Sequence, residues 1–142
     1  MNERRAWRDA AGRPVPPHSP DAVEQVSEVG RTPDEALALA QQLLDDGRPF
    51  YAHDVLEAAW KVAPPAEREL WQGLAQVCVG LTHEQRGNRL GAARLLRRGA
   101  GRLQTAGQAH GVQPLAVASW ALRAADGVER GEHTGPLRLR NG

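Results

Sequence analysis

Residues 70–82, with the sequence LWQGLAQVCVGLT, constrain the fold more than any other stretch of this chain because they contain no charged side chain. A surface helix of this length would carry a charged face, so we expect a helix that is buried on nearly all sides. Its apolar stripe recurs at helical spacing through Leu70, Leu74, Val77 and Leu81. Gly73 and Gly80 share a different side, where a neighbouring helix can approach closely. The stretch therefore predicts a fold in which several helices surround this one.

Helix start and stop signals divide the remaining sequence into further helical segments. Thr32, Pro33 and Glu35 predict an N-cap, a first helical residue and a capping box for a helix that ends near Gly47. Proline and glycine positions predict further helices over residues 49–63, 65–87, 88–107 and 114–127. β-Branched residues are scarce, and no segment alternates as a strand does. We therefore expect an all-α fold, a compact antiparallel bundle of about five helices.

The chain of 142 residues has room for one domain with a real core. We assign the helical-bundle domain to residues 31–130. Residues 1–30 contain closely spaced prolines and are expected to form an extended arm, in which Trp7 is the large apolar residue. This arm is either loosely held or anchored by Trp7 on the domain or on a neighbouring subunit, which leaves a homo-oligomer open. Residues 131–142, rich in Gly and Arg, are expected to form a flexible C-terminal tail.

Charge and cysteine content narrow the classes of function. The net charge of +1 demands no polyanionic partner, and Cys78 is the single cysteine, so no intrachain disulfide can form. We find neither a membrane-length apolar stretch nor a secretory signal, and we expect a cytoplasmic protein with no membrane association. A basic stripe that could meet nucleic acid consists of Arg94, Arg97, Arg98 and Arg102. Since no aromatic residues interleave with it, a solvated helix face is the favoured interpretation.

The stretch FYAHDVLEAAW, residues 50–60, places an imidazole and a carboxylate on the apolar side of its helix. At about 100° per residue, His53, Glu57 and Trp60 point in nearly the same direction, together with Phe50 and Leu56. We expect this side to face the core. The opposite side is expected to hold Tyr51, Asp54, Ala58 and Lys61.

Polar partners for this stripe are available on the helix expected at residues 65–87. Gln72, Gln76 and His83 lie within about 40° of one another on a helical wheel. A buried polar group without a partner costs roughly 1–3 kcal/mol, so polar stripes on neighbouring helices should meet. We therefore expect the second and third helices to face each other across one polar cluster, which consists of His53, Glu57, Gln72, Gln76 and His83.

These motifs resemble the family known as domain of unknown function 309 (DUF309). The stretches that carry the resemblance are FYAHDVLEAAW, WQGLAQVCVGLTHEQRGN and GAARLL, and the likeness covers about residues 32–107. The family's pattern maps onto Phe50, His53, Asp54, Glu57, Trp60, Trp71, Gln72 and Gly73. This chain departs from the pattern at Tyr51, Asp54 and Ala58, where the family often has glutamate. With fewer carboxylates available as ligands, the case for a site with several metal ions is weaker. The resemblance implies an all-helical fold and no established activity.

Four interpretations of the polar cluster remain open. His53, Glu57 and His83 could ligate a divalent metal that activates water for hydrolysis. Glu57 could instead orient His53 as a general base, without a metal. In both cases a substrate would be bound by the neighbouring polar and aromatic side chains, Gln72, Gln76, Trp60 and Trp71, with the tryptophans walling the pocket. The cluster could also bind a small molecule without catalysis, or it could be a satisfied polar network in a non-catalytic helical interaction module.

Overall fold

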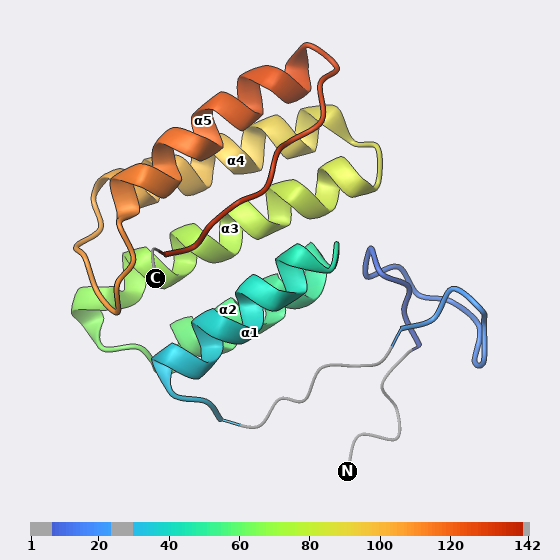
Figure 1. The fold of residues 1–142 in the computed structure, drawn as a ribbon, viewed down its shortest axis with the longest axis horizontal. Helices are drawn as coiled ribbons and strands as arrows, with labels where there is room; N and C mark the ends of the chain where they lie inside the picture. Colours follow the sequence, from blue (N-terminus) through green and yellow to red (C-terminus); the bar gives the residue numbers. More distant parts are fainter. Residues whose placement is uncertain (1–6, 24–29, 141–142) are drawn as a thin grey trace.

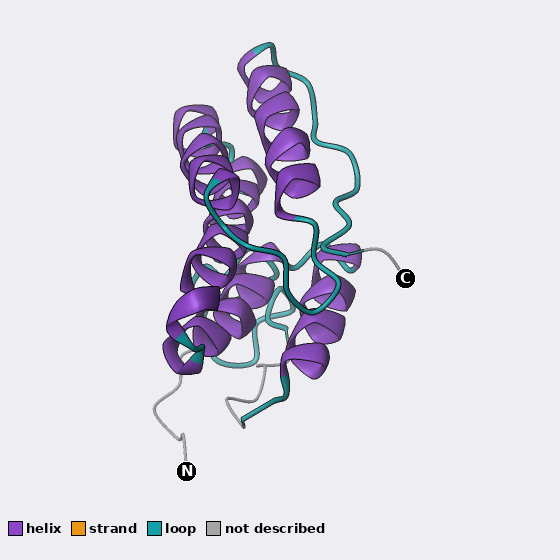
Figure 2. Ribbon diagram, turned by 90° about the vertical axis from the view of Figure 1, so that its left-hand side faces the viewer, coloured by secondary structure: helices purple, strands orange, loops and turns teal. Residues whose placement is uncertain are grey.

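The computed structural model describes residues 7–23 and 30–140, and the chain in these ranges is built from helices and their connections (Figure 1). The elements are α1 (Pro33–Asp45), α2 (Pro49–Val62), the 3-10 turn η1 (Pro65–Glu67), α3 (Arg68–Gln85), α4 (Arg89–Gln104) and α5 (Pro114–Glu129). Within the described ranges the extended pairings are single β-bridges, and no strand is drawn (Figure 2). The all-α bundle expected from the sequence is confirmed.

The helix ends follow the local signals in the sequence. Thr32 Oγ1 accepts a hydrogen bond from the backbone nitrogen of Glu35 (3.1 Å), and the Glu35 carboxylate accepts one from the backbone nitrogen of Thr32 (2.8 Å), so the predicted capping box forms. Asn88 caps α4 by accepting from the backbone nitrogen of Gly91 at 2.9 Å. α5 continues to Glu129, beyond its predicted end at residue 127.

α3 is the central helix of the bundle. It packs against α2 and α4 and touches α5, while α1 packs on α2 and α5 packs on α4. Figure 1 shows α3, α4 and α5 running side by side, with α2 next to α3 and α1 packed on α2. Leu70, Leu74 and Val77 on α3 are fully buried, as the uncharged sequence of this helix predicts. Among the described residues, no helix combines the length and the apolar character that crossing a membrane requires.

α3 and α4 approach each other most closely where both helices carry glycine. A Cβ atom added at Gly73 would lie 3.2 Å from the carbonyl oxygen of Gly99, and one added at Gly99 would lie 2.9 Å from the carbonyl oxygen of Gly73. A Cβ added at Gly80 would lie 3.1 Å from the carbonyl oxygen of Ala92. Close-packed backbone atoms cannot easily move aside, so the glycines set the distance between these helices. The side of α3 that was predicted to admit a neighbour is the side that meets α4.

Residues 7–23, the described part of the expected N-terminal arm, form a loop that packs against α2 and α3. Gly12 has a φ of 82°, and a Cβ added there would lie 2.2 Å from Cγ of Phe50, so glycine is required for both reasons. The Arg86 side chain donates to the carbonyl oxygen of Ala11 at 3.0 Å. The loop is therefore attached to the bundle by its backbone and by the Phe50 ring.

Trp7, the residue considered as an anchor, lies within the same loop. Its ring centroid is 4.7 Å from that of His18, and the residue is 41% exposed. The contacts that attach the loop to the bundle involve Asp9, Ala11 and Gly12 instead, and no local sequence pattern predicts them.

Residues 131–140, expected to be a flexible tail, run back across the bundle after α5 (Figure 1). Leu137 and Leu139 are 5% and 1% exposed and belong to the main apolar core. This segment therefore forms part of the main apolar core.

The glycine contact between α3 and α4 can be tested with a matched pair of substitutions on α4. Alanine normally stabilises a helix relative to glycine by about 1 kcal/mol. We expect Gly99→Ala to destabilise the protein instead, by roughly 1–3 kcal/mol, because its Cβ would overpack the helix interface. Gly101→Ala should stabilise it by about 0.5–1 kcal/mol, because open space surrounds Gly101. Urea unfolding measures both, and a stabilising Gly99→Ala would contradict the close approach.

Candidate functional site

His53 and Glu57 lie one helical turn apart on α2, as the sequence predicts. His53 Nε2 is 2.8 Å from Glu57 Oε2, and His53 Nδ1 is 3.6 Å from Asp54 Oδ1. The side chains of His53 and Glu57 are 20% and 43% exposed, so the pair lies at the edge of the buried face and remains open to solvent. Lys61 Nζ approaches the second Glu57 oxygen at 3.8 Å.

This pair forms one wall of a pocket between α2 and α3, which we call the α2–α3 pocket. Its volume is about 150 Å³, and its lining residues are His53, Glu57, Trp60, Gln72, Ala75, Gln76 and Val79. The structure thus brings together His53, Glu57, Trp60, Gln72 and Gln76 from the set predicted by sequence.

The two glutamines of the pocket differ in their hydrogen bonds. Gln76 Oε1 accepts a bond from Arg102 Nε at 3.1 Å, and the same guanidinium donates to Glu69 at 2.9 Å, so α4 holds the Gln76 amide in place. Gln72 is half-buried, and none of the hydrogen bonds found among the described residues involves its side chain. The Gln72 amide therefore has both its donor and its acceptor groups open to a ligand.

His83 does not reach the α2–α3 pocket. It lies seven residues beyond Gln76 on α3, about 10 Å further along the helix axis, and its Nδ1 is 3.2 Å from Nδ2 of Asn88. Burial and the nearby charges of Arg86 and Arg94 lower the pKa of His83. The proposed triad of His53, Glu57 and His83 is therefore not assembled in this structure.

The described residues provide no alternative metal site. Across residues 7–23 and 30–140, no three His, Cys, Asp or Glu side chains converge in a way that could hold a metal ion. The donor set of the α2–α3 pocket, one imidazole and one carboxylate beside two amides, does not fit a transition metal, because amides are poor ligands for such ions.

Trp71 also lies away from the pocket. It is 2% exposed, and its indole nitrogen donates to Glu67 Oε1 at 3.1 Å. Trp71 follows Leu70 on the core side of α3, so of these two tryptophans Trp60 lines the pocket and Trp71 does not. The Arg68 guanidinium stacks over the Trp60 ring at 4.7 Å from its centroid.

Tyr51 was expected on the outer side of α2, but it is fully buried. Its hydroxyl donates to the carbonyl oxygen of Asp9 in the N-terminal loop at 3.2 Å. The prediction from the helical wheel considered only the side of α2 that faces the other helices. The N-terminal loop covers a second side of α2, the side that carries Tyr51. Asp54 is likewise half-buried beside His53, while Ala58 and Lys61 are exposed as expected.

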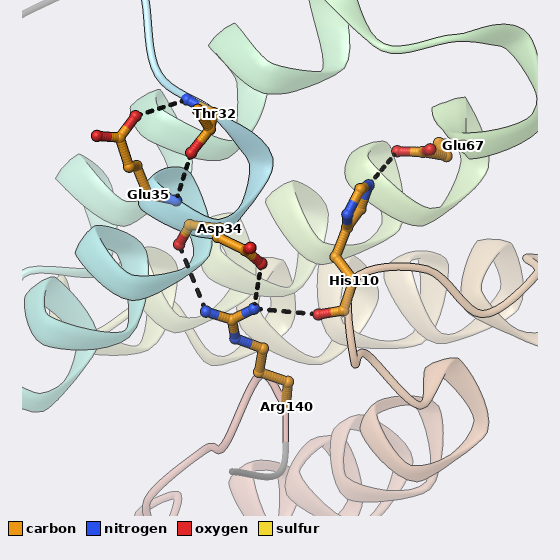
Figure 3. A network of polar contacts seen from close by, with 6 residues as sticks. All are labelled: Thr32, Asp34, Glu35, Glu67, His110 and Arg140. Carbon is orange, nitrogen blue, oxygen red and sulfur yellow. Dashed lines mark hydrogen bonds and ion pairs between the residues drawn. The ribbon is translucent and has the colours of Figure 1, made fainter.

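A second histidine–carboxylate pair, which no sequence motif predicts, lies at the end of the bundle (Figure 3). His110 Nε2 is 2.8 Å from Glu67 Oε1, the oxygen that also accepts from Trp71. His110 has a φ of 54°, which is unusual for a residue other than glycine. Its carbonyl oxygen accepts a hydrogen bond from Arg140 at 3.1 Å, and Arg140 also pairs with Asp34. The pair thus ties η1, the α4–α5 connection and the C-terminal segment together.

The arginines of α4 do not form one free basic stripe. Arg97 donates to Glu129 and Asp126 of α5 at 2.8 Å each, and these hydrogen bonds, that to Glu129 first, raise its pKa. Arg102 pairs with Glu69 of α3 at 2.9 Å. Because Arg97 and Arg102 are matched by acidic groups on different helices, the stripe carries less free charge than its sequence suggests.

Comparison with known proteins confirms the resemblance noted in the sequence. Residues 37–95 match the family described as a domain of unknown function, DUF309, and this range contains every residue that lines the pocket. An uncharacterized protein, YpuF of Bacillus subtilis (strain 168), is 44% identical over 48 residues. That match covers 33% of this chain and 28% of the relative's length. No solved structure matches the chain significantly.

The Glu67–His110 pair predicts a pH dependence of stability. Burial alone would raise the pKa of Glu67. The hydrogen bonds from His110 and Trp71 together lower it by more than burial raises it, so the pKa lies below its usual value. Such a group stabilises the fold above its unfolded pKa of about 4.3, and this contribution disappears as the pH falls through the folded pKa. We expect wild type to lose more unfolding free energy than Glu67→Gln between pH 6 and pH 3.

The control for this measurement is His110→Asn, since asparagine also tolerates a positive φ. It removes the imidazole donor, so its loss of stability on acidification should be intermediate. Identical acid dependence in wild type and Glu67→Gln would contradict the assignment.

Proposed function

We propose, from the premise that residues 37–95 form a DUF309 domain, that this domain binds a small polar molecule in the α2–α3 pocket without a metal ion. The family itself has no established function. The observation that carries the proposal is the convergence of unlike polar groups from two helices, His53 and Glu57 on α2 and Gln72 and Gln76 on α3, around a solvent-accessible space.

The chemistry of the lining suggests the class of ligand. Glu57 offers an accepting carboxylate, and Gln72 offers a donor and an acceptor on one amide. Gln76 has its oxygen engaged by Arg102, which leaves its amino group to donate. Trp60 supplies a flat apolar wall. A planar, neutral group that both donates and accepts hydrogen bonds, such as an amide or a nitrogen heterocycle, fits these features.

The size of the pocket limits the ligand further. A volume of about 150 Å³ is below the range of roughly 300–1,000 Å³ that is typical for sites of drug-sized molecules. An engineered cavity of about this size in another protein holds benzene. The bound group is therefore about the size of a single ring, either a whole small molecule or one end of a larger one.

The pocket's exposure distinguishes this proposal from a closed structural network. In a network that serves only to fix helix packing, each buried polar group has a protein partner. Here Gln72 has open hydrogen-bonding groups, and Glu57 is 43% exposed.

General acid–base catalysis is the second candidate, and the 2.8 Å contact between His53 and Glu57 favours it. Covalent catalysis by cysteine is disfavoured, because burial raises the pKa of the Cys78 thiol to about 12.

A fragment screen by NMR tests the proposal. The library should contain single-ring amides, ureas and nitrogen heterocycles, with carboxylic acids for comparison. We expect binders to shift the side-chain resonances of Gln72, Gln76 and His53. Gln72→Leu should weaken the best binder about tenfold, the equivalent of one hydrogen bond of about 1.4 kcal/mol.

The matched control is Gln104→Leu, which alters an exposed glutamine on α4. It should leave binding unchanged, and Gln72→Leu should change the free energy of unfolding by less than about 1 kcal/mol, since its amide is open to water. Binders that map to other surfaces, or equal affinity for wild type and Gln72→Leu, would count against the proposal.

Metal ions provide a separate test. A metal at about a hundred times its dissociation constant would stabilise the folded protein by roughly 2.7 kcal/mol. Because the donor groups do not converge, we expect zinc, manganese and nickel to leave the melting temperature within error of the chelator-treated protein. A rise of several degrees that His53→Ala abolishes would reinstate the metal site.

A further inference from the structure

The C-terminal segment, residues 132–140, contacts the bundle as an extended peptide contacts a binding surface. Leu137 and Leu139 are buried, whereas Arg138 between them is exposed, which is the period of two expected for an extended chain against a surface. The side chain of Gln41 on α1 donates to the carbonyl oxygen of Leu137 and accepts from the backbone nitrogen of Leu139, both at 2.9 Å. An amide that pairs with main-chain groups in this way holds a peptide as a neighbouring strand would.

Both ends of the segment are held by acidic residues of the bundle. The Glu84 carboxylate accepts from the backbone nitrogen and the hydroxyl of Thr134, at 2.9 and 2.6 Å. At the other end Arg140 donates to Asp34 at 2.7 Å, as Figure 3 shows. These acidic anchors on α3 and α1, with Gln41 between them, define the segment-binding surface.

The segment does not fill the space available to it. A second pocket, of about 580 Å³, lies between residues 133–137 and the surface formed by Leu44, Gly47 and Leu81. Its volume is in the range typical of ligand sites. Gly135 contributes to the lining, and a Cβ added there would meet no atom within 4 Å. The surface therefore has room for a larger side chain at this exposed position.

We propose that the segment-binding surface recognises an extended, basic peptide of a partner protein, and that residues 132–140 occupy this surface in cis. The partner peptide has two apolar residues separated by one exposed residue, as Leu137 and Leu139 are, with a basic residue following them and a large apolar residue in place of Gly135. The partner must displace the chain's own segment, so occupancy in cis regulates access. This surface is separate from the α2–α3 pocket.

Fluorescence anisotropy with a labelled synthetic peptide of residues 131–142 tests the proposal on the full-length protein. In the variant Leu137→Asp/Leu139→Asp, two buried charges release the segment from the surface. If the segment is docked in more than about 90% of wild-type molecules, the variant should bind the peptide at least tenfold more tightly than wild type. The protein variant Arg138→Ala, altered at an exposed position, should behave as wild type.

Two altered peptides sharpen the result. A peptide with Asp at positions 137 and 139 should not bind. A peptide with Gly135→Leu should bind several-fold more tightly than the native sequence, because the second pocket accommodates the new side chain. Equal, weak binding of all peptides to a folded variant would overturn the proposal.

If the variant Leu137→Asp/Leu139→Asp does not fold, circular dichroism still tests the proposal through the helical signal. In that case the native peptide added in trans should restore the helical signal, and failure to do so would show that the segment is only part of the core. Light scattering, which measures the oligomeric state, tests whether a second copy of the chain occupies the surface. A wild-type dimer that the double variant loses would show that the segment of a second copy fills the surface, and would contradict a separate partner.

Discussion

The close approach of α3 and α4 is the contact on which the rest of the structure depends. Gly73 and Gly99 bring the two backbones near each other: a carbon added at Gly99 would collide with the carbonyl oxygen of Gly73, and one added at Gly73 would crowd that of Gly99. Because of this short distance, the backbone of α4 covers one side of α3, and apolar side chains cover its other buried sides. An uncharged sequence is what such a central position requires, because a charged side chain there would be desolvated without a partner.

The position of α3 in turn places the polar groups of the candidate site. With its glycine side against α4, the helix presents Gln72 and Gln76 toward α2, at the edge where His53 and Glu57 emerge from the core. Arg102 extends from α4 to orient the Gln76 amide. The pocket thus draws on three helices, although only two of them line it. The same packing leaves other surfaces of the bundle to the N-terminal loop and the C-terminal segment.

The helices and the meeting of two polar stripes could be predicted because both follow from local signals. Caps and breakers act over a few residues, and a helical wheel gives direction around an axis. A wheel gives no position along the axis, which is why His83 was grouped with Gln76 although about 10 Å of helix separates them. The burial of Tyr51 and the docking of residues 132–140 depend on contacts between segments distant in sequence, for which the chain carries no periodic signal.

Nuclear Overhauser effects between α2 and α3 side chains in the unliganded protein test this arrangement most directly. If α3 turns its glycines toward α4 and its glutamines toward α2, protons of Gln72 and Ala75 should show cross-peaks to ring protons of His53 or Trp60. These residues line one pocket of about 150 Å³. His83 should show none to His53. Cross-peaks from Gln72 to α4 instead of α2 would mean that α3 is rotated, and the α2–α3 pocket would not exist.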